Sequence, residues 1–175
     1  MNMKTEAFVS VEEYLKTSYE PDCDYVDGEV HERNVGERDH SVLQAELVFF
    51  FRQRRELWKT FVFPEQRLQI RPRRFRVPDV CVYVGASPAE QIFRTPPFIC
   101  IEILSPEDRM ERIQERIDDY LNFGVRYMWL INPRSRRAWT YSKEGGTEIS
   151  DGFLRTETPA FEIPLPEIFA PLDAK

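Results

Sequence analysis

Apolar side chains recur along the chain with two spacings, one typical of buried strands and one typical of helices. Nearly every residue is apolar in Arg76–Val84 and in Phe98–Leu104, so both segments are predicted to be strands covered on both faces. Apolar residues follow the helical period within His40–Arg54, which predicts a helix. The same period predicts another helix between Ser105, its expected N-cap, and Gly124.

Shorter elements complete the predicted order. A capping box of Ser10 and Glu13 indicates a helix over Val9–Leu15, and Asn34–Arg38 is expected to be a polar loop. Further extended segments are expected at Asp24–Glu32, with a turn or bulge at Gly28, and at Phe61–Pro64, Gln66–Ile70, Tyr127–Ile131 and Ala138–Tyr141. This order predicts one α/β domain over residues 1–175, with a core at about 9–170 and a mixed central sheet.

Two carboxylates interrupt the strongly apolar strands. Asp79 lies near the start of Arg76–Val84, and Glu102 lies near the end of Phe98–Leu104. A buried carboxylate needs a partner, a proton or a metal ion. If the two strands pair antiparallel, the carboxylates meet at one edge of the sheet and form a site suited to Mg²⁺ or Mn²⁺. The alternative is that each one caps a helix or pairs with a buried arginine.

The charge is distributed unevenly, which changes the meaning of the acidic average. The chain has 24 Lys and Arg against 30 Asp and Glu, a net charge of −6. Between Arg52 and Arg76, nine basic residues face two acidic ones, so this segment carries +7 and the rest −13. The asymmetry predicts a surface for a polyanion, although solvated arginines would give the same pattern. The expected nucleic-acid contacts are Arg67, Arg71, Arg73, Arg74 and Arg76.

Several classes of protein are excluded by simpler features. The longest apolar stretches, such as Leu47–Phe51, are far shorter than the roughly 20 residues of a membrane span. Met1–Ser10 has no apolar region typical of a secretory signal. Three cysteines without a C-x-x-C spacing argue against a disulfide scaffold and against a zinc knuckle. We therefore expect a cytoplasmic protein without membrane partners.

The sequence resembles a bacterial family of restriction-endonuclease-like proteins within the PD-(D/E)XK nuclease superfamily. Pro78-Asp79 and Glu102-Ile103-Leu104 resemble the superfamily signature with its last position altered. The resemblance covers roughly residues 9–170. It is also carried by Val11–Leu15, Tyr25–Val30, His40-Ser41, Val77–Val80, Cys100–Pro106 and Tyr120–Trp129. It implies a mixed sheet flanked by helices, with an acidic site at one end.

The resemblance also implies a chemistry and shows where this chain departs from it. Asp79 and Glu102 would hold Mg²⁺ or Mn²⁺, which polarises the scissile phosphate and activates water. The usual lysine after the Glu is Leu104 here, and the lysine that the family often supplies from the next helix is Arg116. Arg112 stands where the family often has an acid. An arginine can stabilise phosphate charge but cannot act as a general base.

Four further residues are possible accessory members of the site. His40 is expected to contact a metal-bound water or a phosphate, unless it is simply a satisfied histidine at the edge of the core. Glu65 and Gln66 precede a strand and could replace missing site groups. Asp24 could be a peripheral acid near the metal, but a turn-forming role beside Asp27 is favoured.

Two functions follow from these observations. The first is a metal-dependent hydrolase that cleaves phosphodiester bonds in DNA, with Asp79, Glu102 and Arg116 in the site. The second is a catalytically decayed relative that binds nucleic acid or protein, which the altered positions favour. Three successive phenylalanines, Phe49–Phe51, cannot all face one core, so a homodimer is also expected.

Overall fold

The computed structural model describes residues 8–33 and 37–174. Most of Met1–Ser10, on which the expected lack of a secretory signal rests, lies outside the described residues, as do three residues of the predicted loop Asn34–Arg38. In the part that is described, the helices are α1 (Val11–Lys16), α2 (Arg38–Gln53), α3 (Arg55–Trp58), α4 (Met110–Phe123), α5 (Leu165–Phe169) and the 3₁₀ helix η1 (Ala170–Asp173).

The strands of the described residues form three sheets. The six-stranded sheet has the order β10-β9-β8-β7-β6-β3, a smaller sheet has the order β2-β1-β5-β4, and β11 pairs with β12. The strands are β1 (Asp24–Val26), β2 (Glu29–His31), β3 (Thr60–Pro64), β4 (Leu68–Arg71), β5 (Arg74–Arg76), β6 (Val80–Val84), β7 (Ile99–Ile103), β8 (Tyr127–Asn132), β9 (Arg137–Ser142), β10 (Gly145–Glu148), β11 (Phe153–Arg155) and β12 (Glu162–Pro164).

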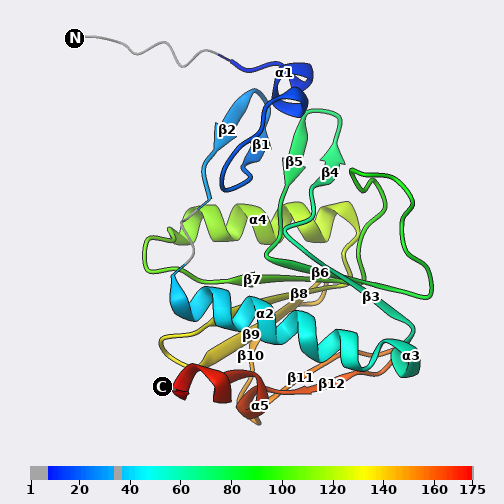
Figure 1. The fold of residues 1–175 in the computed structure, drawn as a ribbon, viewed down its shortest axis with the longest axis vertical. Coiled ribbons are helices and arrows are strands. Elements are labelled where there is room, and N and C mark those ends of the chain that lie inside the picture. The colour runs from blue at the N-terminus through cyan, green and yellow to red at the C-terminus, as the bar shows by residue number, and fades with distance from the viewer. Residues whose placement is uncertain (1–7, 34–36, 175) are drawn as a thin grey trace.

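The six-stranded sheet is covered on both faces, as the apolar runs predict. Alternate residues of β6 and β7 belong to different cores: Val80 and Ile101 pack with α2, whereas Cys81 and Cys100 pack with α4. Figure 1 shows α4 on one side of this sheet and α2 on the other. The sheet is mixed, because β7 pairs parallel with β8 while its other neighbour, β6, runs antiparallel. The predicted mixed α/β core is therefore confirmed.

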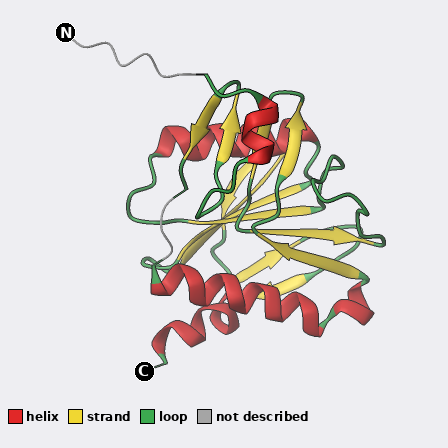
Figure 2. Cartoon of the chain, turned by 45° about the horizontal axis from the view of Figure 1, so that its top comes forward, coloured by secondary structure: helices red, strands yellow, loops and turns green. Residues whose placement is uncertain are grey.

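The smaller sheet lies beyond α4, so that α4 is placed between the two sheets (Figures 1 and 2). The segment Asp24–Glu32 forms the β1–β2 hairpin, and its turn at Asp27-Gly28 has positive φ at both residues. This is the geometry that favours glycine in a tight hairpin turn. α1 begins after Ser10, whose hydroxyl accepts from the backbone N–H of Glu13, as the capping box predicts.

One expected strand is in fact two strands in different sheets. The prediction of a continuous strand over Arg76–Val84 is wrong, because β5 ends at Arg76 and β6 starts at Val80. Pro78 cannot donate to a strand ladder, and the backbone N–H of Val77 donates to the carboxylate of Asp24 instead. The chain therefore leaves the smaller sheet and enters the larger one just before β6.

The start of α4 also differs from the prediction. The structure places the helix over Met110–Phe123, and Ser105 instead opens a turn in which the N–H of Asp108 donates to the Ser105 carbonyl. The N–H of Ser105 donates to the Asp108 carboxylate at 2.7 Å, which competes with helix initiation. Met110, expected in the buried stripe, is 68% exposed. The predicted end at Gly124 is confirmed, with φ of 112°.

Smaller differences concern α2, its phenylalanines and the cysteines. α2 begins at Arg38, two residues before the predicted start, and its N-cap is Glu37. Phe50 and Phe51 are buried, whereas Phe49 is 54% exposed. Cys23, Cys81 and Cys100 are buried and free. Within the described ranges, no helix is both long and apolar enough to cross a membrane.

Buried ion pairs join the smaller sheet to α4. The guanidinium of Arg76, at the end of β5, is 2.9 Å from Asp24 of β1 and 2.5 Å from Asp119 of α4. Arg74 adds a second bond to Asp119 at 2.8 Å. Because all of these charges lie in or near the interior, each depends on its partners for the solvation it has lost.

Replacing Arg76 with alanine tests this junction. The Arg76→Ala variant leaves Asp24 and Asp119 buried with fewer partners, so we expect a loss of about 3–5 kcal/mol in the free energy of unfolding. Arg137→Ala is the control, because its pair with Glu148 is exposed to solvent and should contribute little to stability. Urea unfolding followed by circular dichroism measures both, and equal losses would contradict the proposed junction.

Candidate functional site

Asp79 and Glu102 lie opposite one another at the end of the antiparallel pair β6–β7. The register pairs Val80 with Ile101, so the next step beyond the ladder sets Asp79 against Glu102. The backbone N–H of Ile103 donates to Asp79 Oδ2 at 2.7 Å, which holds the carboxylate beside β7. The antiparallel pairing on which the sequence prediction depends is therefore present, and it brings the two acids to one edge of the sheet.

Asp79 is buried among hydrogen-bond donors. Its Oδ1 contacts Nη2 of Arg33 and lies 3.2 Å from Nε2 of His40. Burial by itself would raise the pKa of Asp79, but the hydrogen bond with His40 and the charge of Arg33 hold it below its ordinary value. The same contact raises the pKa of His40 despite its burial. Asp79 is thus held as a carboxylate.

Glu102 has a different electrostatic environment. Its Oε1 accepts from the hydroxyl of Tyr120 at 2.6 Å, and its Oε2 accepts from Nη1 of Arg116 at 3.0 Å. Burial raises the pKa of Glu102 to about 7; Arg116 opposes this shift and the negative charge of Asp79 adds to it. The two facing carboxylates therefore differ in how firmly the fold keeps them ionised.

Arg116 connects the carboxylate pair to the smaller sheet. Besides Glu102, it donates from Nε to Asp24 Oδ2 at 3.2 Å. Asp24 is buried, and burial would raise its pKa, but Arg116 and Arg76 hold the pKa of Asp24 below its ordinary value. The favoured turn-forming role of Asp24 is wrong, because its carboxylate binds two arginines and the N–H of Val77.

The other predicted accessory residues separate into two groups. His40 lies beside Asp79, and Glu65 lies 3.6 Å from Nη1 of Arg33. Gln66 instead donates to the backbone carbonyls of Arg67 and Gln91, and so its amide is used in the loop. The structure therefore brings His40 and Glu65 toward the carboxylate pair and engages Gln66 elsewhere.

The predicted nucleic-acid contacts are mostly engaged within the protein. Arg67 pairs with Asp22, and Arg74 and Arg76 pair with Asp119. Arg76 is buried and has no surface to offer a phosphate, which corrects the expected role for this residue. Arg71 and Arg73 remain exposed at the turn between β4 and β5.

Sequence reasoning missed two members of the site. Arg33 carried no signal, because it follows the β1–β2 hairpin in a polar stretch without periodicity. Tyr120 fits the apolar stripe of α4, and its hydroxyl bond to Glu102 appears only in the folded chain. A tyrosine on a core-facing stripe near an isolated buried acid is the one signal that could have indicated the contact.

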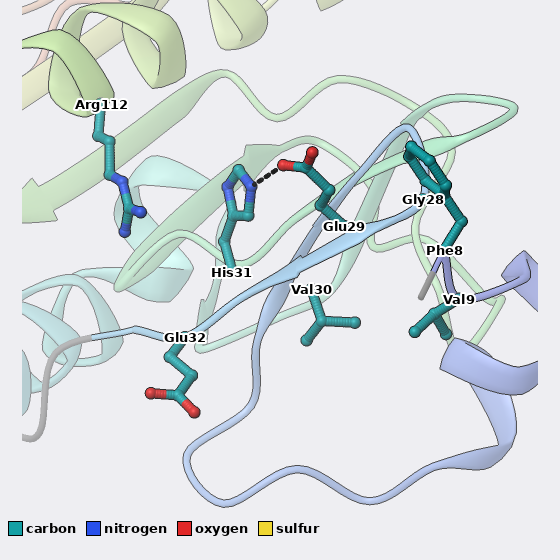
Figure 3. A pocket seen from close by; sticks show the side chains of 8 residues that line it. All are labelled: Phe8, Val9, Gly28, Glu29, Val30, His31, Glu32 and Arg112. Carbon is teal, nitrogen blue, oxygen red and sulfur yellow. Dashed lines mark hydrogen bonds and ion pairs between the residues drawn. The ribbon is translucent and has the colours of Figure 1, made fainter. Parts of the chain in front are cut away.

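Three hollows lie near Asp79 and along α4, and neighbouring ones share a lining arginine. A cavity of about 20 Å³, enough for roughly one water molecule, is lined by Asp79, Arg33, His40 and Arg116 among others. Arg116 also lines a hollow of about 150 Å³ together with Arg112. Arg112 in turn reaches a larger pocket of about 480 Å³ beside the β1–β2 hairpin, drawn in Figure 3.

The donor set fits a divalent cation that the substrate completes. In the described residues, no group of three or more His, Cys, Asp and Glu side chains is arranged to hold a metal ion. Mg²⁺ is commonly bound through one or two carboxylates plus waters and substrate phosphates, which matches two facing acids. Two carboxylates offer about eight lone pairs. Five of these are taken by donors of the protein, namely Arg33, His40, Ile103, Arg116 and Tyr120.

A mixed sheet flanked by helices, with two acids at the end of neighbouring strands, defines a restriction-endonuclease-like α/β protein. The chain matches the family model Uma2, described as "Putative restriction endonuclease", over residues 11–173. The protein therefore belongs to the Uma2 family, which confirms the resemblance seen in the sequence.

A similar solved structure agrees with this assignment of the fold. It is a "putative nuclease belonging to DUF820" from Anabaena variabilis ATCC 29413. It has a TM-score of 0.79 and 22% sequence identity, and the match covers 93% of this chain and 98% of that chain. At this identity the likeness concerns the fold alone. The comparison with curated proteins found no match.

The bond between Tyr120 and Glu102 can be tested by removing one oxygen atom. Tyr120→Phe keeps the ring but leaves a buried carboxylate oxygen without its donor, so we expect a loss of about 1–3 kcal/mol in the free energy of unfolding. Tyr127→Phe is the matched control, because its hydroxyl bonds are exposed. Urea unfolding measures both, and an unchanged Tyr120→Phe variant would show that the bond is not formed in solution.

Proposed function

We propose that this protein is a divalent-metal-dependent endonuclease that hydrolyses phosphodiester bonds in DNA. The observation that carries the proposal is the buried, register-opposed pair of Asp79 and Glu102 at the end of β6 and β7. Membership in a family of restriction-endonuclease-like proteins supports nuclease chemistry. The hard oxygen donors of this pair suit Mg²⁺ or Mn²⁺.

Each acid would have its own role. A divalent cation supplies two things when it is bound: it polarises the scissile phosphate and lowers the pKa of a coordinated water. Asp79, kept ionised by His40 and Arg33, provides the permanent negative charge. Glu102 is oriented by Tyr120 and Arg116, which fix both of its oxygens.

Arg116 would stabilise the phosphate rather than accept a proton. Its guanidinium lines the cavity beside the carboxylates and stays charged at every relevant pH. It can therefore balance the charge that develops on the phosphate, while Asp24 holds it in place. Because positions 104 and 116 are not lysine, a phosphate oxygen of the substrate would accept the proton of the attacking water.

Contacts to the rest of the DNA would come from exposed groups. Arg71 and Arg73 are the members of the predicted arginine set that the fold leaves exposed. His40, which lines the cavity beside Asp79, would contact a phosphate or a cation-bound water. A second copy of the chain would cover the exposed ring of Phe49, the residue on which the proposed homodimer depends.

One observation favours a second function, binding of nucleic acid or protein without cleavage. Arg33 and Arg116 already neutralise the two carboxylates, so the apo site has little excess negative charge to attract a cation. A decayed relative would keep this neutral arrangement permanently. Salt-dependent DNA affinity without any cleavage would support that function.

The metal site is tested with Asp79→Asn and Glu102→Gln. Each change keeps the side-chain shape but removes a negative charge, and so we expect DNA cleavage in Mn²⁺ or Mg²⁺ to fall at least about 100-fold. Plasmid and single-stranded DNA are incubated with each protein, and gels report the products. Asp173→Asn, at an exposed acid far along the chain, is the control. Cleavage that survives either change, or that survives EDTA, would contradict the proposal.

The role of Arg116 is tested by comparing lysine with alanine at this position. Arg116→Lys restores a residue type that can both bind phosphate and orient water, so cleavage should equal or exceed that of the wild type. Arg116→Ala removes the charge and should lower the rate constant about 100-fold or more. Single-turnover cleavage in Mn²⁺ measures both, with circular dichroism as the check on folding. Equal rates for all three proteins would exclude Arg116 from the reaction.

A further inference from the structure

Arg33 is bound to the carboxylate that the proposed metal site requires. Its side chain is only 6% exposed, and Nη2 contacts Asp79 Oδ1. That oxygen also lies 3.2 Å from His40, so both of its lone pairs are in use. A divalent cation can reach Asp79 Oδ1 only if one of these two donors moves away.

Charge decides which of the two donors must move. Arginine stays protonated, so Arg33 and a divalent cation repel one another at any working pH. Arg33 also has a second acidic neighbour, because its Nη1 lies 3.6 Å from Glu65 Oε1. Arg33 is therefore the donor that a cation binding at Oδ1 of Asp79 would displace.

Glu65 offers the displaced guanidinium another carboxylate. Nη1 of Arg33 is buried without a hydrogen bond, yet it lies 3.6 Å from Glu65 Oε1. The side chain of Glu65 is 46% exposed, and no other contact is found for it within the described residues. The backbone N–H of Glu65 donates to the carbonyl of Asp79 at 3.1 Å, which fixes the two acids on either side of Arg33.

We propose that Arg33 competes with the divalent cation for Asp79, and that Glu65 receives the guanidinium when the cation binds. The inference rests on the proposed metal-dependent function and deepens it. Arg33 is then a positioning residue that sets the cation affinity, while Glu65 sets how readily Arg33 leaves. The unused Nη1 makes the move short, because the second partner is already near.

A double-mutant cycle on Mn²⁺ binding tests the proposal by isothermal titration calorimetry. Arg33→Ala removes the competitor, and the Mn²⁺ dissociation constant should fall about five-fold or more, within the usual range of coupling between two ligands. Glu65→Gln removes the alternative partner and should weaken Mn²⁺ binding by about the same factor. In the Arg33→Ala background, Glu65→Gln should have no further effect.

Matched controls separate this coupling from general effects of charge and stability. Arg137→Ala and Glu148→Gln alter an exposed pair on β9 and β10 and should leave Mn²⁺ binding unchanged. Arg33→Gln is the second variant if Arg33→Ala unfolds, and it too should bind Mn²⁺ more tightly. Thermal unfolding with and without Mn²⁺ gives an independent readout, since Mn²⁺ should stabilise the Arg33 variants more than the wild type.

Each remaining outcome overturns a defined part of the proposal. Unchanged or weaker Mn²⁺ binding by the folded Arg33 variants overturns the competition but leaves the metal site intact. Loss of affinity from Glu65→Gln in the Arg33→Ala background would make Glu65 a metal ligand instead. Absence of Mn²⁺ binding in both the wild type and the Arg33 variants would overturn the metal-dependent function together with this inference.

Discussion

A buried chain of alternating carboxylates and guanidiniums is the interaction on which the rest of this structure depends. It runs from the end of β7 in the six-stranded sheet to the β1–β2 hairpin and includes a residue of α4. Its members, in order, are Glu102, Arg116, Asp24, Arg76, Asp119, Arg74 and Asp27, and the chain reaches solvent at Asp27, whose side chain is exposed. A buried charge is tolerated only when a partner replaces its lost water, so each member fixes the next. The same contacts that join the two sheets therefore orient the candidate site.

This arrangement explains why the arginine-rich segment is not simply a surface for DNA. Arg74 and Arg76 form ion pairs with acids inside the protein, although the sequence predicted that they contact a polyanion. The local excess of positive charge balances negative charge contributed by α4 and the hairpin. Arg71 and Arg73 stay exposed, and Arg33 and Arg116 line the small cavity beside Asp79. Charge counted along a sequence thus differs from charge available at a surface.

Local signals in the sequence predicted most elements but misplaced two boundaries. The apolar runs identified the buried strands, because a strand covered on both faces leaves few polar positions. The continuous strand expected across Pro78 failed because the N–H of Val77 bonds to Asp24, a residue more than fifty positions earlier. The helix expected to begin after Ser105 begins instead at Met110, because Asp108 closes a turn with Ser105. Both errors arise where a side chain competes with the backbone ladder.

The sequence by itself determined the two-sided sheet, the family and the candidate acids, because isolated carboxylates stand out within apolar strands. Only the tertiary structure decided which groups surround those acids. Antiparallel register set Asp79 against Glu102, and the folding of the hairpin over α4 delivered Arg33 and Asp24 from distant positions. The partners of a buried charge are the groups that lie close to it in the folded chain. The spacing of residues along the sequence does not indicate which groups these are.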